Sequence, residues 1–421
     1  MARLCASRDT LHWQHRRPIR PREPLASVAQ CTPRTPTARP SAVSMTEANS
    51  PRHLRSKPLH REIELDFIRG IAILMVVDFH TSGSPFRSLC LWLGYQDHIG
   101  VLGVDIFFVL SGFLVGGLLM KEWKVRRGID GKRFLIRRGF KIWPQYYFYL
   151  AVMLFTGHRT LSFLWGNLLN IQNYVGGVAH TWSLAIEEHC YLLLTLCMVI
   201  ASRRKSSVRG LFWFLFAVCA LEIPFRYWLV THGHLVFLPT HARLDSIGDG
   251  VLLAMLFHFA PEWFDRLRSL TWLWLLCLGV GLLVYRGHYS SRFILAQSHD
   301  SATLIAIATL MLLYRPLREG RTHNSIYRFV AWIGVYSYGI YLWHPSVVAP
   351  TEAFFARHAI LPFWIATILV RVAEVGIGVL TTRFCEIPAL RLRDRLFPRR
   401  VDTPVGPPAL EEATGVVTTT V

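Results

Sequence analysis

Residues 99–120 read IGVLGVDIFFVLSGFLVGGLLM, a run in which Asp105 is the only charged side chain. About 20 consecutive apolar residues suffice for a helix to cross the hydrocarbon core of a bilayer. The run therefore predicts a transmembrane helix, and it marks Asp105 as a charge buried within that helix.

The whole chain has the composition of a membrane protein. Of its 421 residues, 52% are hydrophobic and 17% are charged, whereas about 25% are charged in a typical soluble domain. The 14 Trp residues suit the aromatic belts that form at membrane interfaces. The eight cysteines include no Cys-x-x-Cys pair, so we expect neither a disulfide framework nor a metal site.

Ten apolar segments of spanning or near-spanning length follow one another after residue 60. They lie at about 65–82, 99–120, 142–157, 181–201, 210–230, 245–260, 270–285, 301–314, 326–347 and 361–383. Residues 160–180 are a candidate re-entrant segment. The pattern predicts an all-α membrane protein, a polytopic bundle of about ten transmembrane helices.

The net charge of +19 is unevenly distributed. Residues 1–60 hold 11 basic residues, 3 acidic residues and eight of the 22 prolines, and we expect a disordered basic segment there. Met45 opens a more ordinary cytosolic lead, so residues 1–44 are a candidate over-extension of the gene start. We predict a transmembrane domain at 61–390 and a cytosolic C-terminal tail at 391–421.

Loop charges indicate the topology. If the N-terminus is cytosolic, the inner loops and the tail carry 23 basic residues and the outer connections carry six. Short cytoplasmic loops of membrane proteins are enriched in Lys and Arg. The asymmetry predicts that both termini are cytosolic, and it accounts for the positive charge without a nucleic-acid partner.

Several ionisable side chains fall within the predicted spans. Each costs about 2.5–3.5 kcal/mol on insertion scales, so a functional site is the default hypothesis. These residues are Asp66, Arg69, Asp78, His80, Asp105, Glu187, Glu188, Arg371 and Glu374. Arg371 and Glu374 are three residues apart on one helix face, so we expect them to form a structural ion pair.

Depth sorts the remaining charges into two layers. At a rise of about 1.5 Å per residue, His80 falls in the outer third of the membrane, as do three carboxylates, Asp105, Glu187 and Glu188. We predict these four as the catalytic residues, because a neutral imidazole oriented by a carboxylate can act as a general base towards a hydroxyl.

The inner layer is cationic. Arg69 lies near the inner face, close to the basic stretch 132–141, and we predict that four cations hold a phosphate-bearing donor from the cytosol: Arg69, Arg137, Arg138 and Lys141. A ligand that reaches both layers must be long and thin, with phosphates at one end and the reacting group at the other. Acyl-coenzyme A has that shape.

The two adjacent glutamates are not equivalent on a helix. Glu187 shares a face with His180, Ser183 and Tyr191, a polar stripe that is expected to line the cavity. We therefore favour Glu187 over Glu188 as the partner of His80.

Six motifs recur in order along residues 61–390. They are Arg69 and His80 separated by ten residues, GVDIFFVLSGFL (103–114), HTWSLAIEEHCYLL (180–193), ARLDSIGDG (242–250), SYGIYLWHP (337–345) and EIP (386–388). Together they resemble the acyltransferase 3 family of bacterial integral membrane proteins.

The resemblance implies O-acylation, usually O-acetylation, by a multi-pass protein of the bacterial cytoplasmic membrane. The acceptor would be an extracytoplasmic carbohydrate or a lipid-linked one. The donor substrate would be cytosolic acyl-CoA, acetyl-CoA above all, with no permanently bound cofactor. On that basis His80 is the catalytic histidine, Arg69 contacts the donor, and Glu187 and Glu188 assist. Whether His80 is a general base or a transient acyl carrier stays open.

The chain departs from the family pattern in two places. The basic motif before the third span often has Arg where this chain has Lys141, and Lys keeps the charge but loses the bidentate fork. Some members also carry a fused SGNH-type hydrolase domain outside the membrane, a domain that we do not expect in this chain. We therefore expect either direct transfer or a separate extracytoplasmic partner protein.

Other functions remain as alternatives. Within the enzyme class, the acceptor could instead be a small secondary metabolite such as a macrolide. A transporter is the alternative from a different class, since intramembrane charges also mark substrate pathways, although no inverted repeat is visible. A non-enzymatic anchor would not need His and Glu at matched depth.

The topology yields a first prediction. Cysteines introduced in the 121–141 and 203–209 loops should not react with a membrane-impermeant thiol reagent added outside intact cells, because both loops face the cytosol. The same cysteines should react once the membrane is opened. Strong labelling of either loop from outside would overturn the predicted orientation.

Overall fold

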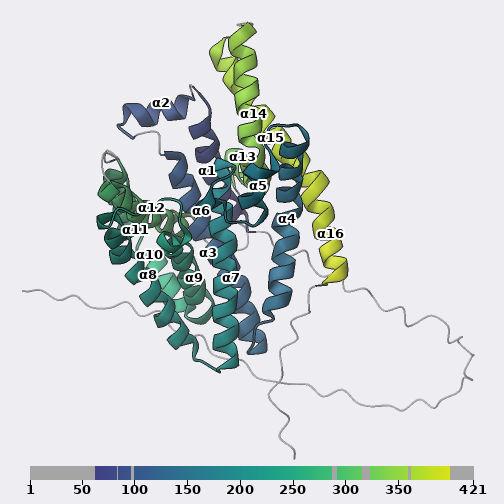
Figure 1. The fold of residues 1–421 in the computed structure, drawn as a ribbon. Coiled ribbons are helices and arrows are strands. Elements are labelled where there is room, and N and C mark those ends of the chain that lie inside the picture. The colour runs from purple at the N-terminus through teal and green to yellow at the C-terminus, as the bar shows by residue number, and fades with distance from the viewer. Residues whose placement is uncertain are drawn as a thin grey trace, which may run out of the picture. The chain divides into compact units, whose positions relative to one another are not determined.

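The computed structural model describes residues 62–82, 84–95, 99–286, 292–314, 323–358 and 362–398. Every regular element in these ranges is a helix, which confirms the all-α membrane fold class (Figure 1). The predicted disordered segment 1–60 and the tail beyond residue 398 lie outside the described residues.

The helices follow the chain with short connections. They are α1 (Ile63–His80), α2 (Pro85–Trp92), α3 (Ile99–Arg126), α4 (Gly131–Phe155), α5 (Leu161–Leu168), α6 (Gln172–Val175), η1 (Ala179–Thr181), α7 (Trp182–Arg203), α8 (Val208–Thr231), η2 (Thr240–Ala242), α9 (Leu244–Phe259), α10 (Pro261–Ser269), α11 (Thr271–Tyr285), α12 (Arg292–Leu313), α13 (Ser325–Val335), α14 (Ser337–His358), α15 (Phe363–Thr381), the π-helical turn η3 (Thr382–Glu386) and α16 (Ile387–Leu396).

Helix α3 is the centre of the bundle. It packs against α1, α7, α9 and α12, and its side chains enter three separate hydrophobic clusters, represented by Phe113, Phe108 and Leu119. A helix that is apolar on all sides is stable only when it is surrounded. The run at residues 99–120 therefore both forms this helix and places it in the middle.

The helix boundaries differ from the expected segments in two places. The third segment was expected at 142–157, but α4 already begins at Gly131, where the Asp130 side chain accepts a hydrogen bond from the Arg133 amide at 3.1 Å. Such a cap satisfies a free amide at a helix start. The basic stretch 132–141 is thus helical, not a loop. The segment expected at 326–347 is two helices, α13 and α14, which meet at Tyr336.

The candidate re-entrant segment at 160–180 consists of short helices. The elements α5, α6 and η1 lead into α7, and Asn167 ties them together by donating to the Thr181 hydroxyl at 2.8 Å and accepting from the Val178 amide at 3.0 Å. The polar groups of this segment are thus hydrogen-bonded to one another, and the segment leads directly into the start of α7.

Four described helices are long and apolar enough to cross a membrane: Gly100–Arg126, Ala179–Arg203, Val208–Thr231 and Trp364–Leu396. A fifth span results if α9 and α10, bent by 118°, count as one. Other expected spans are shorter or more charged; α1, for example, carries Glu64, Asp66, Arg69 and Asp78. The number of ten spans and the cytosolic termini therefore stay predictions.

Close helix contacts depend on paired glycines. In α3, a Cβ on Gly112 would overlap the Ile247 carbonyl of α9, and a Cβ on Gly250 of α9 would overlap the Val109 carbonyl of α3. Lipid provides no hydrophobic drive for helices to associate, so small residues that allow close backbone approach are enriched at such contacts. The two glycines set the closest part of the α3–α9 contact.

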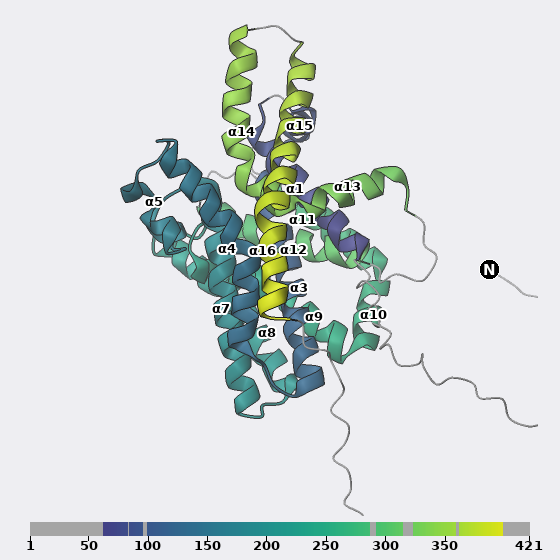
Figure 2. The ribbon, with the colours of Figure 1, turned by 90° about the vertical axis from the view of Figure 1, so that its right-hand side faces the viewer.

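Helices α14 and α15 form an antiparallel pair. Figure 2 shows α14 and α15 side by side, with α16 continuing from α15 along α4. As expected, Arg371 and Glu374 pair on α15, with Nη1 and Oε2 3.2 Å apart, and Arg371 also binds Asp78 of α1 at 2.6 Å. These pairs hold α15 against the end of α1.

Candidate active site

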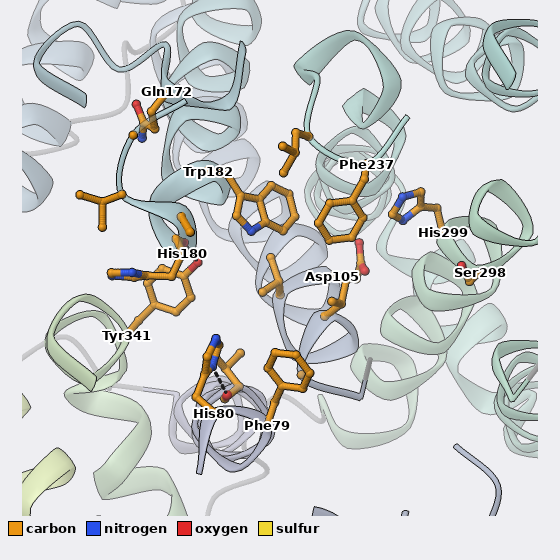
Figure 3. Close-up of a pocket in the computed structure, with 18 of the residues that line it drawn as sticks. Phe79, His80, Asp105, Gln172, His180, Trp182, Phe237, Ser298, His299 and Tyr341 are labelled. Atoms are coloured by element: carbon orange, nitrogen blue, oxygen red, sulfur yellow. Dashed lines mark hydrogen bonds between the residues drawn. The ribbon is translucent and has the colours of Figure 1, made fainter. Parts of the chain in front are cut away.

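A cavity of about 670 Å³, the outer cavity, opens at the end of α1. Its wall comes from α1, α3, the 172–182 segment, α12 and α14 (Figure 3). The labelled side chains around it are Phe79, His80, Asp105, Gln172, His180, Trp182, Phe237, Ser298, His299 and Tyr341. Apolar and aromatic surface with a few convergent polar groups is typical of a binding pocket.

His80 is held by two hydrogen-bond partners and remains accessible from this cavity. Its Nδ1 lies 3.0 Å from the Val76 carbonyl oxygen and 3.2 Å from Nε2 of His344. The His344 ring is fully buried, and its Nδ1 lies 2.7 Å from the Tyr341 carbonyl oxygen.

These partners assign the tautomers of both rings. A carbonyl oxygen can only accept, so Nδ1 of His344 carries the proton that is donated to Tyr341. Its Nε2 is then an acceptor, and Nδ1 of His80 must donate to it and to Val76. In the neutral ring this leaves Nε2 of His80 unprotonated. The arrangement thus leaves His80 a basic nitrogen whose orientation is fixed.

Tyr341 and His180 connect α14 to the start of α7. The Tyr341 hydroxyl donates to the His180 carbonyl oxygen and lies 2.6 Å from the Ser183 hydroxyl. Nε2 of His180 donates in turn to the Leu342 carbonyl oxygen at 3.1 Å. The cavity wall opposite His80 is therefore fixed by reciprocal bonds.

Asp105 lines the outer cavity, but its hydrogen bond does not go to His80. Its Oδ1 accepts from Nη2 of Arg243 at 2.6 Å, and both side chains are fully buried. The Arg243 guanidinium also donates to His299 and lies within 6 Å of the Trp182 and Phe237 ring centroids, where cation–π attraction operates. The structure thus pairs Asp105 with Arg243 and not with His80, and a catalytic role for Asp105 stays a prediction.

A second cavity of about 180 Å³, the inner cavity, lies among α1, α3, α4, α7 and α14. Three predicted donor-binding cations, Arg69, Arg138 and Lys141, line it together with Glu187. Each cation has a carboxylate partner: Asp66 lies 2.7 Å from Arg69, Glu187 lies 3.9 Å from Arg138, and Glu386 binds Lys141. Three of the predicted donor-binding cations thus line a different cavity from His80.

Arg137 does not reach this cavity. Its guanidinium donates to the Phe397 carbonyl oxygen and binds Asp394 at 3.0 Å, so it holds the end of α16. Adjacent residues of a helix point about 100° apart, so Arg138 faces the inner cavity while Arg137 points to another side of α4. The prediction that Arg137 holds the donor is therefore not supported by the geometry.

Glu187 lies in the inner cavity and not beside His80. Its Oε2 accepts from the Tyr191 hydroxyl at 2.8 Å, and that hydroxyl accepts from Arg138 at 2.5 Å. Depth along the helix did not predict this, because adjacent residues of α7 face different cavities: Trp182 lines the outer cavity, and Ser183 lines the inner one together with Glu187. Glu188 lines neither cavity in the described structure, and its Oε1 has no hydrogen-bond partner there.

A family model for an acyltransferase domain matches residues 62–383, which include both cavities. The chain belongs to this acyltransferase family. The matched region begins one residue before α1 and ends within η3. Together with the four long apolar helices, membership indicates a multi-pass membrane protein.

Curated bacterial relatives of this chain support the family assignment. "Putative O-acetyltransferase SACOL0978" of Staphylococcus aureus is 26% identical over 367 residues, which cover 77% of this chain and 56% of the relative. "Peptidoglycan O-acetyltransferase OatA" of Listeria monocytogenes is 23% identical over 361 residues, 77% of this chain and 55% of the relative. The chain thus matches little more than half the length of these relatives. No solved structure matches it.

Two residues of the candidate site were not predicted from the sequence, His344 and Arg243. The sequence does single out both residues, because each lies in one of the six recurring motifs. No sequence pattern pairs His344 with His80, 264 positions away. Only the packing of α1 against α14 brings the two rings together.

The Asp105–Arg243 pair gives a second prediction. Asp105→Leu should lower the free energy of unfolding by about 3–5 kcal/mol, because it leaves Arg243 buried without its partner. The double variant Asp105→Leu/Arg243→Leu should recover much of the loss, since apolar replacements of a buried pair are often tolerated. Thermal melting of the purified protein in detergent measures both.

The matched control is the half-exposed pair of Arg137 and Asp394. Asp394→Leu should cost less than about 1 kcal/mol, as surface pairs do. An Asp105→Leu protein that melts like the wild type but has lost activity would instead give Asp105 a chemical role.

Proposed function

We propose that the chain is an O-acyltransferase of the bacterial cytoplasmic membrane. It moves an acyl group, an acetyl group first of all, from cytosolic acyl-CoA to a hydroxyl of extracytoplasmic or lipid-linked carbohydrate. The observation that carries the proposal is that α1 presents Arg69 to the inner cavity and His80 to the outer one. The printed names of the relatives, among them a peptidoglycan O-acetyltransferase, support a cell-envelope acceptor.

The inner cavity suits the phosphate-bearing end of the donor. Arg69 uses Nη1 for its bond to Asp66, which leaves further guanidinium donors for a phosphate. Nε of Arg138 is buried and has no hydrogen-bond partner among the described residues. The carboxylate partners therefore hold the cations in position without using all their donors.

His80 is placed to act as the general base. In the proposed step, Nε2 of His80 removes the proton of the acceptor hydroxyl. The oxygen of that hydroxyl attacks the carbonyl carbon of the thioester at the same time. The carbon–sulfur bond breaks and a carbon–oxygen ester bond forms. The thiolate of coenzyme A leaves and takes up the proton from the imidazolium, so that ester and free thiol are the only products.

His344 is proposed as the positioning residue for His80. Its Nε2 accepts from Nδ1 of His80, so it fixes the tautomer and stabilises the imidazolium that forms during transfer. This is the task that a carboxylate performs in many catalytic triads.

The outer cavity offers suitable surface for a sugar ring. Trp182 and Phe237 lie with ring centroids 4.9 Å apart on the side facing His80 (Figure 3), and Gln172 adds an amide to the wall. Apolar faces with a few polar groups match a ligand that carries hydroxyls around an apolar ring face.

The third prediction separates the two ends of α1. In membranes supplied with radioactive acetyl-CoA, His80→Gln should lower base-labile incorporation into envelope carbohydrate by about 10²–10⁴-fold, as loss of a general base does. The purified variant should still bind acetyl-CoA. Arg69→Ala should weaken donor binding and raise KM with little change in kcat, and Arg69→Lys should recover only part of it because the fork is lost.

Two results would contradict this assignment. The first is a wild-type protein that incorporates no label from acetyl-CoA. The second is a His80→Gln protein that loses donor affinity while it retains kcat at saturating donor. Mass spectrometry of envelope glycans and small metabolites, with and without the gene, identifies the acceptor.

The fourth prediction concerns His344. A hydrogen bond to a charged group contributes about 1.5–3 kcal/mol, or about 10–100-fold in rate. His344→Leu should therefore lower kcat by that factor and leave acetyl-CoA affinity unchanged. His344→Gln retains an acceptor and should recover much of the rate. Equal losses in the two variants, or a loss of donor affinity, would assign His344 a merely structural role.

A further inference from the structure

Val104 of α3 and Tyr341 of α14 are the two described side chains that line both cavities. Both are nearly buried, with 6% and 7% of their surface exposed. They therefore form part of the partition between the inner and the outer cavity.

Neither side of this partition can move aside easily. The Tyr341 hydroxyl is bound to the His180 carbonyl oxygen and to the Ser183 hydroxyl. Val104 belongs to a hydrophobic cluster that includes Ile73, Val76 and Phe108. A β-branched side chain within a helix has one strongly preferred rotamer, and close-packed interiors respond even to one methylene.

The following inference rests on the proposed function. The sulfur of the donor arrives through the inner cavity, while the acceptor hydroxyl and His80 are in the outer one. The carbonyl carbon of the thioester must then react at the partition, where its short acyl chain lies beside Val104. We infer that Val104, facing Tyr341, determines the length of the acyl chain that is transferred and restricts it to acetyl.

The test compares two donors, acetyl-CoA and propionyl-CoA, in isolated membranes that contain equal amounts of each variant. One methylene in a fitted pocket changes kcat/KM by about 10–200-fold. The wild type should therefore prefer acetyl over propionyl by at least about tenfold. Val104→Ala should reduce this preference by about tenfold or more, and Val104→Ile should increase it.

Two valines on the same helix provide matched controls. Val101 lines only the outer cavity, and Val115 lines only the inner one. Val101→Ala and Val115→Ala should keep the wild-type ratio of acetyl to propionyl transfer. Opposite changes in the two Val104 variants cannot arise from poor folding, because misfolding lowers both donors together.

The outcomes separate this inference from the function on which it rests. Absence of transfer from both donors in the wild type rejects the proposed function. Transfer in the wild type with an unchanged acyl preference in both Val104 variants rejects the inference alone. A change in preference in Val101→Ala or Val115→Ala, with none in Val104→Ala, would move the acyl chain to another part of the cavities and also reject it.

Discussion

The rigid spacing of Arg69 and His80 on α1 is the constraint on which the site depends. Eleven residues at about 1.5 Å each place the two side chains about 16 Å apart along one helix axis. They open into different cavities, and no loop between them can shorten that distance. A substrate that uses both must be elongated, and the rest of the site is arranged around the two ends of this helix.

Close backbone contacts keep α1 in place. A Cβ on Gly70 would overlap the Val330 carbonyl of α13, one on Gly334 would overlap the Asp66 carbonyl, and Gly103 of α3 similarly approaches Ala72. These contacts fix α1 between α13 and α3 by shape alone, which is the means available where lipid surrounds the bundle. They also explain why buried charges are tolerated nearby. Helices held at fixed separation can bring Arg371 to Asp78 and Arg243 to Asp105 with good geometry.

Features that depend on one helix could be predicted from the sequence, and features that depend on helix packing could not. The separation of Arg69 from His80 and the ion pair of Arg371 with Glu374 follow from helical periodicity, and the structure has both. The partners of Glu187 and Asp105 required knowledge of which helices meet. Counting depth from the end of an apolar run left out which way each side chain faces: on α7, Trp182 lines the outer cavity, whereas Ser183 and Glu187 line the inner one. Within one basic motif, Arg138 lines the inner cavity and the adjacent Arg137 does not, since helical rotation alone separates the two side chains.

The partner of His80, which is His344 and not a carboxylate, determines when charge appears in the proposed reaction. A carboxylate beside His80 would add a permanent charge to the outer cavity and would have to be desolvated before any substrate arrives. His344 is instead a neutral acceptor, so the pair carries no charge until His80 takes up a proton. The positive charge then appears at the moment when the attacking oxygen and the leaving thiolate carry negative charge. Stabilisation that arises only in the transition state raises kcat, whereas stabilisation present throughout does not. The permanent ion pairs of the inner cavity suit the opposite task, since a donor phosphate must be held before, during and after transfer.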